Sequence, residues 1–246
     1  MDNYLPDVKL EALDEKGFLS FLEGIGSEKK AEFDKKIIRS SLKIHGITSK
    51  QINDIYKYFH KNGYSNILSF SNKISYEITM LRGRLVLNDK SLDINKKIDF
   101  LNAWIQNVDT WALTDGVFAN YKLKSEDKQA LLSFAESLVS RSLEFEIRLG
   151  VIILLDYFLT DEDIDNTFRI LSDIKYGEYY YVDMAVAWLC ATALIDFEGK
   201  TLAFLNSPFI NDFTYKKSLQ KARESFRIPD EKKIFYKSLL DAKKSS

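Results

Sequence analysis

The chain has 246 residues, of which 46% are hydrophobic and 29% charged, a composition that excludes both a disordered chain and a membrane-inserted one. Its 35 Lys and Arg residues balance 36 Asp and Glu residues, so the formal charge of −1 gives no overall attraction to nucleic acid. One cysteine, Cys190, and two histidines, His45 and His60, exclude an internal disulfide and a zinc site built by the protein. We therefore expect a folded, soluble protein that uses neither a metal nor another cofactor.

The N-terminal segment MDNYLPDVKLEALDEKG is acidic and has neither a basic start nor an apolar stretch. These features are not typical of a secretory signal. We therefore predict that the protein lies in the cytoplasm and does not bind a membrane.

Periodic apolar residues predict helices along most of the chain, and only three prolines lie between them. The first two candidates are 16–22 and 28–43, the second closed by His45-Gly46. Thr48 and Gln51 then have the spacing of a capping box, and a helix follows as far as Asn62-Gly63. Further helices are predicted at 75–88, 94–107, 110–121, 126–140, 144–159, 162–175, 179–197, 200–206, 212–226 and 231–243. No glycine-rich or serine-rich linker divides the chain, which predicts one all-α domain over residues 1–246.

The helix predicted at 144–159 is apolar almost all round and is interrupted on one side by Arg148 and Asp156. Such a helix is covered by neighbours on several sides. Gly150 in its interior costs about 1 kcal/mol relative to alanine, so it indicates a close helix crossing or a ligand that needs room. The helix crossing is the simpler interpretation.

The helix lengths suggest pairs, and a helix pair buries its apolar faces only by stacking on the next pair. Trp111, Arg148 and Trp188 are separated by 37 and 40 residues, close to the period of about 40 to 47 residues of HEAT repeats. The sequence therefore predicts a HEAT-like solenoid of about six helix pairs, with these three side chains on one concave binding face. Trp111 and Asp115 are four residues apart, which places an aromatic plane beside an anion on one helical face.

Three segments carry a resemblance to a known family: Trp111-Ala112-Leu113-Thr114-Asp115, then Glu146-Ile147-Arg148-Leu149, then Asp183-Met184-Ala185-Val186-Ala187-Trp188. In residues, order and spacing they resemble the signature segments of the bacterial DNA alkylation repair family, the AlkD-type HEAT-like repeat DNA glycosylases. The similarity covers roughly residues 28 to 228.

The resemblance implies a glycosylase that releases cationic alkylpurines, such as 3-methyladenine and 7-methylguanine, from duplex DNA. Carried over to this chain, Asp115 stabilises the sugar cation and orients water, Trp111 and Trp188 present their π faces, and Arg148 holds a backbone phosphate. The chemistry is consistent with this set, because glycosidic cleavage develops positive charge on the sugar. A cationic purine leaves without a general acid, which fits a site with one prominent carboxylate and no histidine.

The chain departs from the family pattern in its N-terminal third. Ile37 stands where a DNA-gripping tyrosine is expected, and Ser49, Lys50 and Gln51 replace a segment that commonly has Pro followed by Arg. Two local basic regions are candidates for phosphate contact: 35–60, with six Lys or Arg against one acid, and 214–246, with ten against four. Solvated helix faces are the alternative for the second region.

A purely structural role remains the alternative for each candidate residue. Either Trp could be a core residue, Arg148 could form a surface pair with Glu144, and Asp115 could cap or salt-bridge a helix. At the level of function, the alternatives are a non-catalytic member of the family that binds nucleic acid or a protein, and a protein-interaction scaffold. We expect a monomeric enzyme acting on duplex DNA with alkylated purines.

Overall fold

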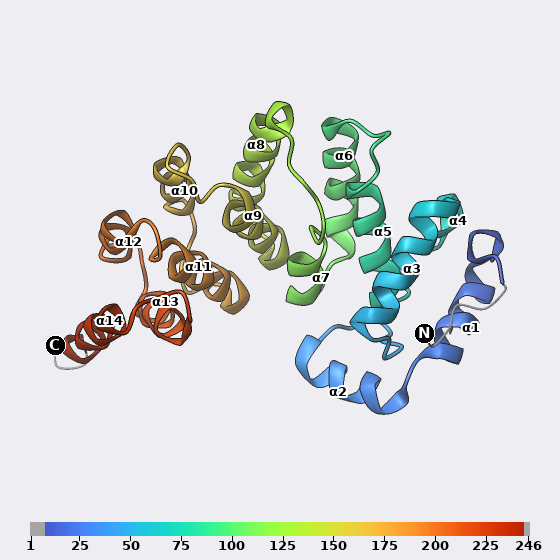
Figure 1. Ribbon diagram of the computed structural model, residues 1–246, viewed down its shortest axis with the longest axis horizontal. Coiled ribbons are helices and arrows are strands. Elements are labelled where there is room, and N and C mark those ends of the chain that lie inside the picture. The colour runs from blue at the N-terminus through green and yellow to red at the C-terminus, as the bar shows by residue number, and fades with distance from the viewer. Residues whose placement is uncertain (1–7, 244–246) are drawn as a thin grey trace. The chain divides into compact units, whose positions relative to one another are not determined.

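The computed structural model describes residues 8–243 (Figure 1), so the first seven residues of the N-terminal segment discussed above lie outside the described residues. Helices account for 68% of the residues, and the described part contains no β-strand, which confirms the all-α prediction. The chain divides into two compact units, unit 1 (residues 1–124) and unit 2 (residues 125–246). The single domain over residues 1–246 stays a prediction, and one cooperative unfolding transition of the whole chain would support it.

Unit 1 is centred on one buried helix. Its helices within the described residues are α1 (Glu15–Ile25), α2 (Glu28–Ile38), α3 (Ser49–Asn62), α4 (Ser65–Ser69), α5 (Tyr76–Leu87), α6 (Ile94–Trp104) and α7 (Trp111–Gly116). Helix α5 packs against α3, α4, α6 and α7, and its Leu81 and Leu85 are completely buried. Burial of these side chains fixes the position of α5, and with it the position of α7, which carries Trp111 and Asp115.

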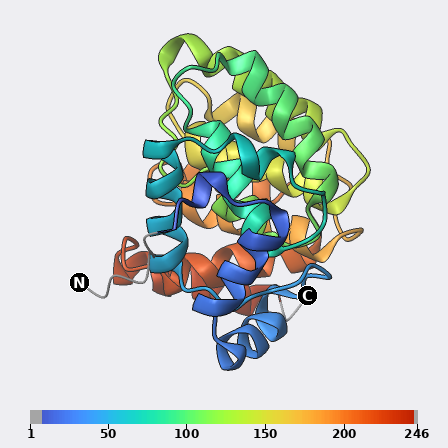
Figure 2. The ribbon, with the colours of Figure 1, turned by 90° about the vertical axis from the view of Figure 1, so that its right-hand side faces the viewer.

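Helix α2 lies at the edge of unit 1 farthest from α6 (Figures 1 and 2). It ends at Ile38, so the predicted continuation to residue 43 is wrong. Arg39 adopts a left-handed conformation with φ 54°, which stops the helix, and the next residues bond to the segment before α7. Gly46 has φ 73°, and a Cβ there would lie 2.1 Å from the Ser27 carbonyl oxygen, so this connection requires glycine.

Two further differences from the predicted elements occur in unit 1. The five-residue helix α4 was not predicted, and α7 ends at Gly116 rather than at residue 121. Both are very short, and a period of 3.6 residues is hard to recognise in one or two turns.

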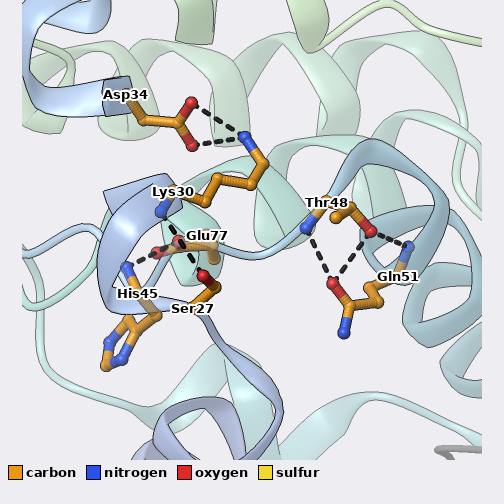
Figure 3. Close-up of polar contacts among 7 residues, drawn as sticks. All are labelled: Ser27, Lys30, Asp34, His45, Thr48, Gln51 and Glu77. Atoms are coloured by element: carbon orange, nitrogen blue, oxygen red, sulfur yellow. Dashed lines mark hydrogen bonds and ion pairs between the residues drawn. The ribbon is translucent and has the colours of Figure 1, made fainter. Parts of the chain in front are cut away.

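The start of α3 confirms the predicted capping box. The Gln51 amide N–H donates to Thr48 Oγ1 at 3.2 Å, and the Thr48 amide N–H donates to Gln51 Oε1 at 2.8 Å (Figure 3). Gln51 Nε2 also donates to the Ile25 carbonyl at 2.9 Å, which ties α3 to the end of α1. The predicted end is confirmed as well, because Gly63 follows Asn62 with φ 99°.

Unit 2 consists of two layers of helices (Figure 1). One layer contains α9 (Glu144–Tyr157), α11 (Tyr180–Ala193) and α13 (Asp212–Glu224), each packed on the next. The other contains α8 (Lys128–Val139), α10 (Ile164–Leu171), α12 (Glu198–Leu205) and α14 (Asp230–Ala242). This is the arrangement of stacked helix pairs expected of helical repeats, and it places Arg148 and Trp188 on successive equivalent helices, α9 and α11.

Gly150 marks a close crossing of α9 and α8. A Cβ at this position would lie 2.8 Å from the Ala135 carbonyl oxygen and 2.9 Å from Val139 Cγ2. The predicted helix crossing is therefore confirmed, and the glycine is needed for backbone approach.

None of the helices of residues 8–243 combines the length and apolar character that a membrane span needs. The same residues contain no group of three or more His, Cys, Asp or Glu side chains placed to hold a metal ion.

Candidate active site

Trp111 and Asp115 lie on the short helix α7 of unit 1. Both side chains are partly exposed, and their spacing of four residues puts them on one face of the helix. The Thr114 hydroxyl lies 3.0 Å from Asp115 Oδ1 and 2.8 Å from the Trp111 carbonyl oxygen. The single hydroxyl proton is shared between these two acceptors, so Asp115 has a polar neighbour on α7 itself.

The segment that leads into α7 is bonded to the segment that follows α2. Asp109 Oδ1 accepts from the Ser40 hydroxyl at 2.6 Å, and Asp109 Oδ2 accepts from the Ser41 amide N–H and hydroxyl, each at 2.6 Å. Charge-assisted hydrogen bonds of this kind are among the stronger polar contacts in proteins. One carboxylate thus holds two parts of the chain that are 68 residues or more apart.

The indole of Trp111 takes part in the same connection. Its Nε1 donates to the Ile37 carbonyl at 3.2 Å, and the Thr110 hydroxyl donates to the Ile38 carbonyl at 2.5 Å. These carbonyls belong to the last turn of α2, where no further helical N–H is available to them. We call the whole set of contacts the α2–α7 latch; it comprises Ile37, Ile38, Ser40, Ser41, Asp109, Thr110 and Trp111.

The structure shows where the two departures from the family pattern lie, Ile37 and the segment 49–51. The Ile37 side chain is 47% exposed, while its carbonyl holds the Trp111 indole. Ser49 and Lys50 are exposed, and Gln51 caps α3 and bonds to the end of α1. The substituted segment therefore serves as a helix start in this chain.

Sequence reasoning missed two groups near Asp115, Tyr76 on α5 and Asp34 on α2. Burial raises the pKa of the Tyr76 hydroxyl, and the carboxylates of Glu77, Asp34 and Asp115 raise that pKa further. Asp34 is 15% exposed and forms an ion pair with Lys30 at 2.6 Å (Figure 3). The Tyr76 hydroxyl consequently stays neutral in surroundings that disfavour a further negative charge.

In unit 2, Arg148 is buried, with 5% of its surface exposed. Its guanidinium donates to the Tyr181 carbonyl on α11, and Glu144 Oε1 accepts from the Tyr181 amide N–H at 2.8 Å. The two α9 side chains therefore bracket one residue of α11. The alternative that Arg148 forms a surface pair with Glu144 is therefore wrong, because Arg148 is buried.

Trp188 lies on α11, two helical turns beyond Tyr181, so the side chains of these two residues share one face of the helix. Its side chain is 42% exposed, which contradicts the alternative that it is a core residue. The other residues around it, Val186, Ala187, Leu189 and Cys190, are buried. Trp188 is therefore the large side chain that this part of α11 presents to solvent.

The candidate residues thus form two pairs, Trp111 with Asp115 in unit 1 and Arg148 with Trp188 in unit 2. Trp111, Asp115 and Arg148 each form hydrogen bonds within their own unit. The convergence of both pairs on one surface stays a prediction.

The two basic regions differ in their ion pairs. Lys35, Lys36 and Arg39 are exposed and form no ion pair within residues 8–243. In the C-terminal region, Lys216 pairs with Asp212 at 2.8 Å and Lys233 with Asp230 at 3.2 Å, and further pairs bind Lys232 and Lys243. Several cations of the second region therefore have carboxylate partners, although Lys217, Lys221, Arg223 and Lys237 have none within residues 8–243, whereas none of the three cations beside the latch has one.

A family model described as DNA alkylation repair enzyme matches residues 19–223. The matched part includes α7, α9 and α11, which carry the four candidate residues. No curated protein matches the chain.

Proposed function

The chain belongs to the DNA alkylation repair enzyme family, and from this premise we propose that it is a DNA glycosylase for cationic alkylpurines in duplex DNA. Its substrates would be nucleotides of the 3-methyladenine and 7-methylguanine type. The observation that supports this best is the pair Trp111 and Asp115, both partly exposed on α7, with the Trp111 indole held by the latch.

In the proposed reaction, the bond between the purine nitrogen and C1′ of the deoxyribose breaks. The electron pair leaves with the purine and neutralises its positive charge, so no general acid is required. The sugar becomes an oxocarbenium ion, which Asp115 stabilises by its charge. Water, oriented by Asp115, then adds to C1′ and loses one proton to solvent.

The remaining candidates have supporting roles in this proposal. Trp111 and Trp188 present π faces to the sugar cation, each contributing about 0.5 to 2 kcal/mol of cation–π attraction. Arg148 would bind a backbone phosphate, which requires its guanidinium to become more accessible than the 5% exposure in this structure. Its bond to the Tyr181 carbonyl fixes the plane of the guanidinium, a group whose planar donors suit phosphate oxygens.

The direct test is release of purines from alkylated duplex DNA by the purified protein. We expect release of 3-methyladenine and 7-methylguanine, and no release of the neutral bases uracil and hypoxanthine, because neutral bases are poor leaving groups. Release of neutral bases at a comparable rate would contradict stabilisation of the sugar cation as the main source of catalysis.

The second candidate function is a non-catalytic family member that binds nucleic acid or a protein partner. Two residues favour this alternative, because both stand where the family pattern has DNA-contacting residues. Ile37 is apolar and contacts Trp111 through its carbonyl, and Gln51 is used at the start of α3. Binding of alkylated duplex DNA without purine release by saturating protein would support this alternative. A protein-interaction scaffold would show neither activity.

DNA binding is expected to depend strongly on salt, because the unbalanced cations beside the latch displace counterions from phosphates. Log affinity should fall against log salt by about 0.9 per phosphate contact. The combined variant Lys35→Gln, Lys36→Gln and Arg39→Asn should reduce this slope by up to about 2.7. Asparagine is chosen at Arg39 because it tolerates the left-handed conformation.

The matched control removes three lysines that already have carboxylate partners: Lys216→Gln, Lys232→Gln and Lys233→Gln. It should leave the slope nearly unchanged. Equal slopes for the two triple variants would show that the region beside the latch is not the phosphate-binding surface.

A further inference from the structure

Unit 1 contains a pocket of about 290 Å³ that the proposed glycosylase site does not use. Its walls come from α4, α5, α6, the connection between α4 and α5, and the turn after α6. One part of the wall is apolar and consists of Leu68, Phe100 and Trp104. The other part carries cationic and amide side chains, those of Asn72, Lys73 and Arg82. Among the described residues that line it, none is acidic.

Arg82 is held in place by three neutral acceptors. Its Nη1 donates to the Phe70 carbonyl at 3.3 Å and to Asn72 Oδ1 at 3.1 Å, and Nη2 donates to the Leu68 carbonyl at 3.1 Å. A guanidinium has five N–H donors, so two remain, the Nε–H among them. Arg82 forms no ion pair within residues 8–243; burial lowers its pKa and the nearby Glu15 carboxylate partly offsets this effect.

Lys73 adds a second positive charge to the pocket. It adopts the left-handed conformation with φ 61°, uncommon for a residue other than glycine, in the connection that leads into α5. Like Arg82, it forms no ion pair in the described part of the chain. Two cations face a wall of aromatic and aliphatic carbon.

The apolar wall is itself fixed by a buried hydrogen bond. Trp104 is 4% exposed, and its Nε1 donates to the Thr79 carbonyl at 2.8 Å. The indole therefore keeps one orientation beside Phe100. A prearranged site loses little conformational entropy when a ligand enters it.

We propose that this pocket binds a small organic anion consisting of one aromatic ring and one phosphate or carboxylate group. The anionic group would lie on the two remaining donors of Arg82 and near Lys73, and the ring against Phe100 and Trp104. The volume supports a ligand of this size, because sites for larger ligands span about 300 to 1,000 Å³. The proposal rests on unit 1 alone and does not depend on the glycosylase function.

The test is titration of the full chain with phenyl phosphate, followed by the backbone and indole N–H signals in NMR spectra. We expect the Lys73 amide, the Arg82 Nε–H and the Trp104 indole N–H to shift together. Benzoate should shift the same three signals. Comparison of its affinity with that of phenyl phosphate shows whether the pocket prefers a carboxylate or a phosphate group. Inorganic phosphate, which lacks the ring, and benzyl alcohol, which lacks the charge, should each bind at least about tenfold more weakly than phenyl phosphate.

Two variants decide the role of the cations. Arg82→Gln should weaken phenyl phosphate binding by about tenfold or more, as expected when a charged hydrogen-bonding partner is lost. Arg82 also connects the α4–α5 segment to α5, so Lys73→Asn provides the independent variant, since asparagine keeps the left-handed backbone and loses the charge. Lys73→Asn should weaken binding by at least about threefold, while Lys90→Gln, an exposed change outside the pocket, should not alter it.

Absence of shifts at the three pocket signals would overturn the proposal. So would equal binding of benzyl alcohol and phenyl phosphate, or wild-type affinity in Lys73→Asn. If Arg82→Gln fails to fold, the result for Lys73→Asn decides.

Discussion

Replacing Asp115 by asparagine is expected to lower the single-turnover rate of 7-methylguanine release by about 100-fold or more, with DNA affinity changed by less than about threefold. Asparagine keeps the size of the side chain and the contact with the Thr114 hydroxyl, but it removes the negative charge. The charge acts mainly where the sugar becomes cationic, so its loss raises the barrier more than it weakens binding. The measurement compares rate and affinity for the two proteins on one duplex.

Asp99→Asn is the matched control, since it makes the same change at an exposed position of α6 in the same unit. It should leave both rate and affinity at wild-type values. Equal release rates for wild type and Asp115→Asn would remove Asp115 from the proposed mechanism, even if alkylpurine release itself is observed.

Gly150→Ala is expected to destabilise the protein by about 1 to 3 kcal/mol, although alanine is the better helix former. The added Cβ would lie 2.8 Å from the Ala135 carbonyl oxygen, and the contact atom belongs to the backbone of α8. The two helices must therefore separate, which weakens the packing of their buried side chains. Urea unfolding of the variant and the wild type measures the difference.

Gly199→Ala provides a control of opposite sign. Gly199 lies in the first turn of α12, is exposed, and has no atom within 4 Å of the position that a Cβ would take. There the change should stabilise the protein by up to about 1 kcal/mol, through helix propensity alone. Stabilisation by both changes would mean that the α8–α9 crossing has room for a methyl group.

Local patterns in the sequence were sufficient to predict most helices. The capping box of Thr48 and Gln51, the end of α3 at Asn62 and the close crossing at Gly150 depend on neighbouring residues or on one helix, and all three are confirmed. The end of α2 could not be predicted in this way. Its residues up to Lys43 have acceptable helix propensity, and the helix stops because Ser40 and Ser41 bond to Asp109 instead.

The candidate site also shows that local sequence patterns do not predict contacts between distant segments. Trp111, Asp115, Arg148 and Trp188 could be selected because their spacing and their motifs are visible along the chain. Asp109, Ser40 and Tyr76 carry no local signal, and their relation to Trp111 or Asp115 arises only when α2, α5 and α7 pack together. For Arg148, the sequence could not show that its neighbour is the backbone of Tyr181, because a carbonyl is present at every residue.

The α2–α7 latch has an evolutionary consequence. Asp109 satisfies two hydroxyls and one amide that lie about seventy positions earlier in the chain, and losing any one of these partners leaves an acceptor or a donor without its hydrogen bond. Substitutions at positions 40, 41 and 109 should therefore be coupled, so that homologues change them together or not at all. A descendant that shed its first two helices would keep the Trp-Ala-Leu-Thr-Asp signature in its gene while losing the support of its tryptophan.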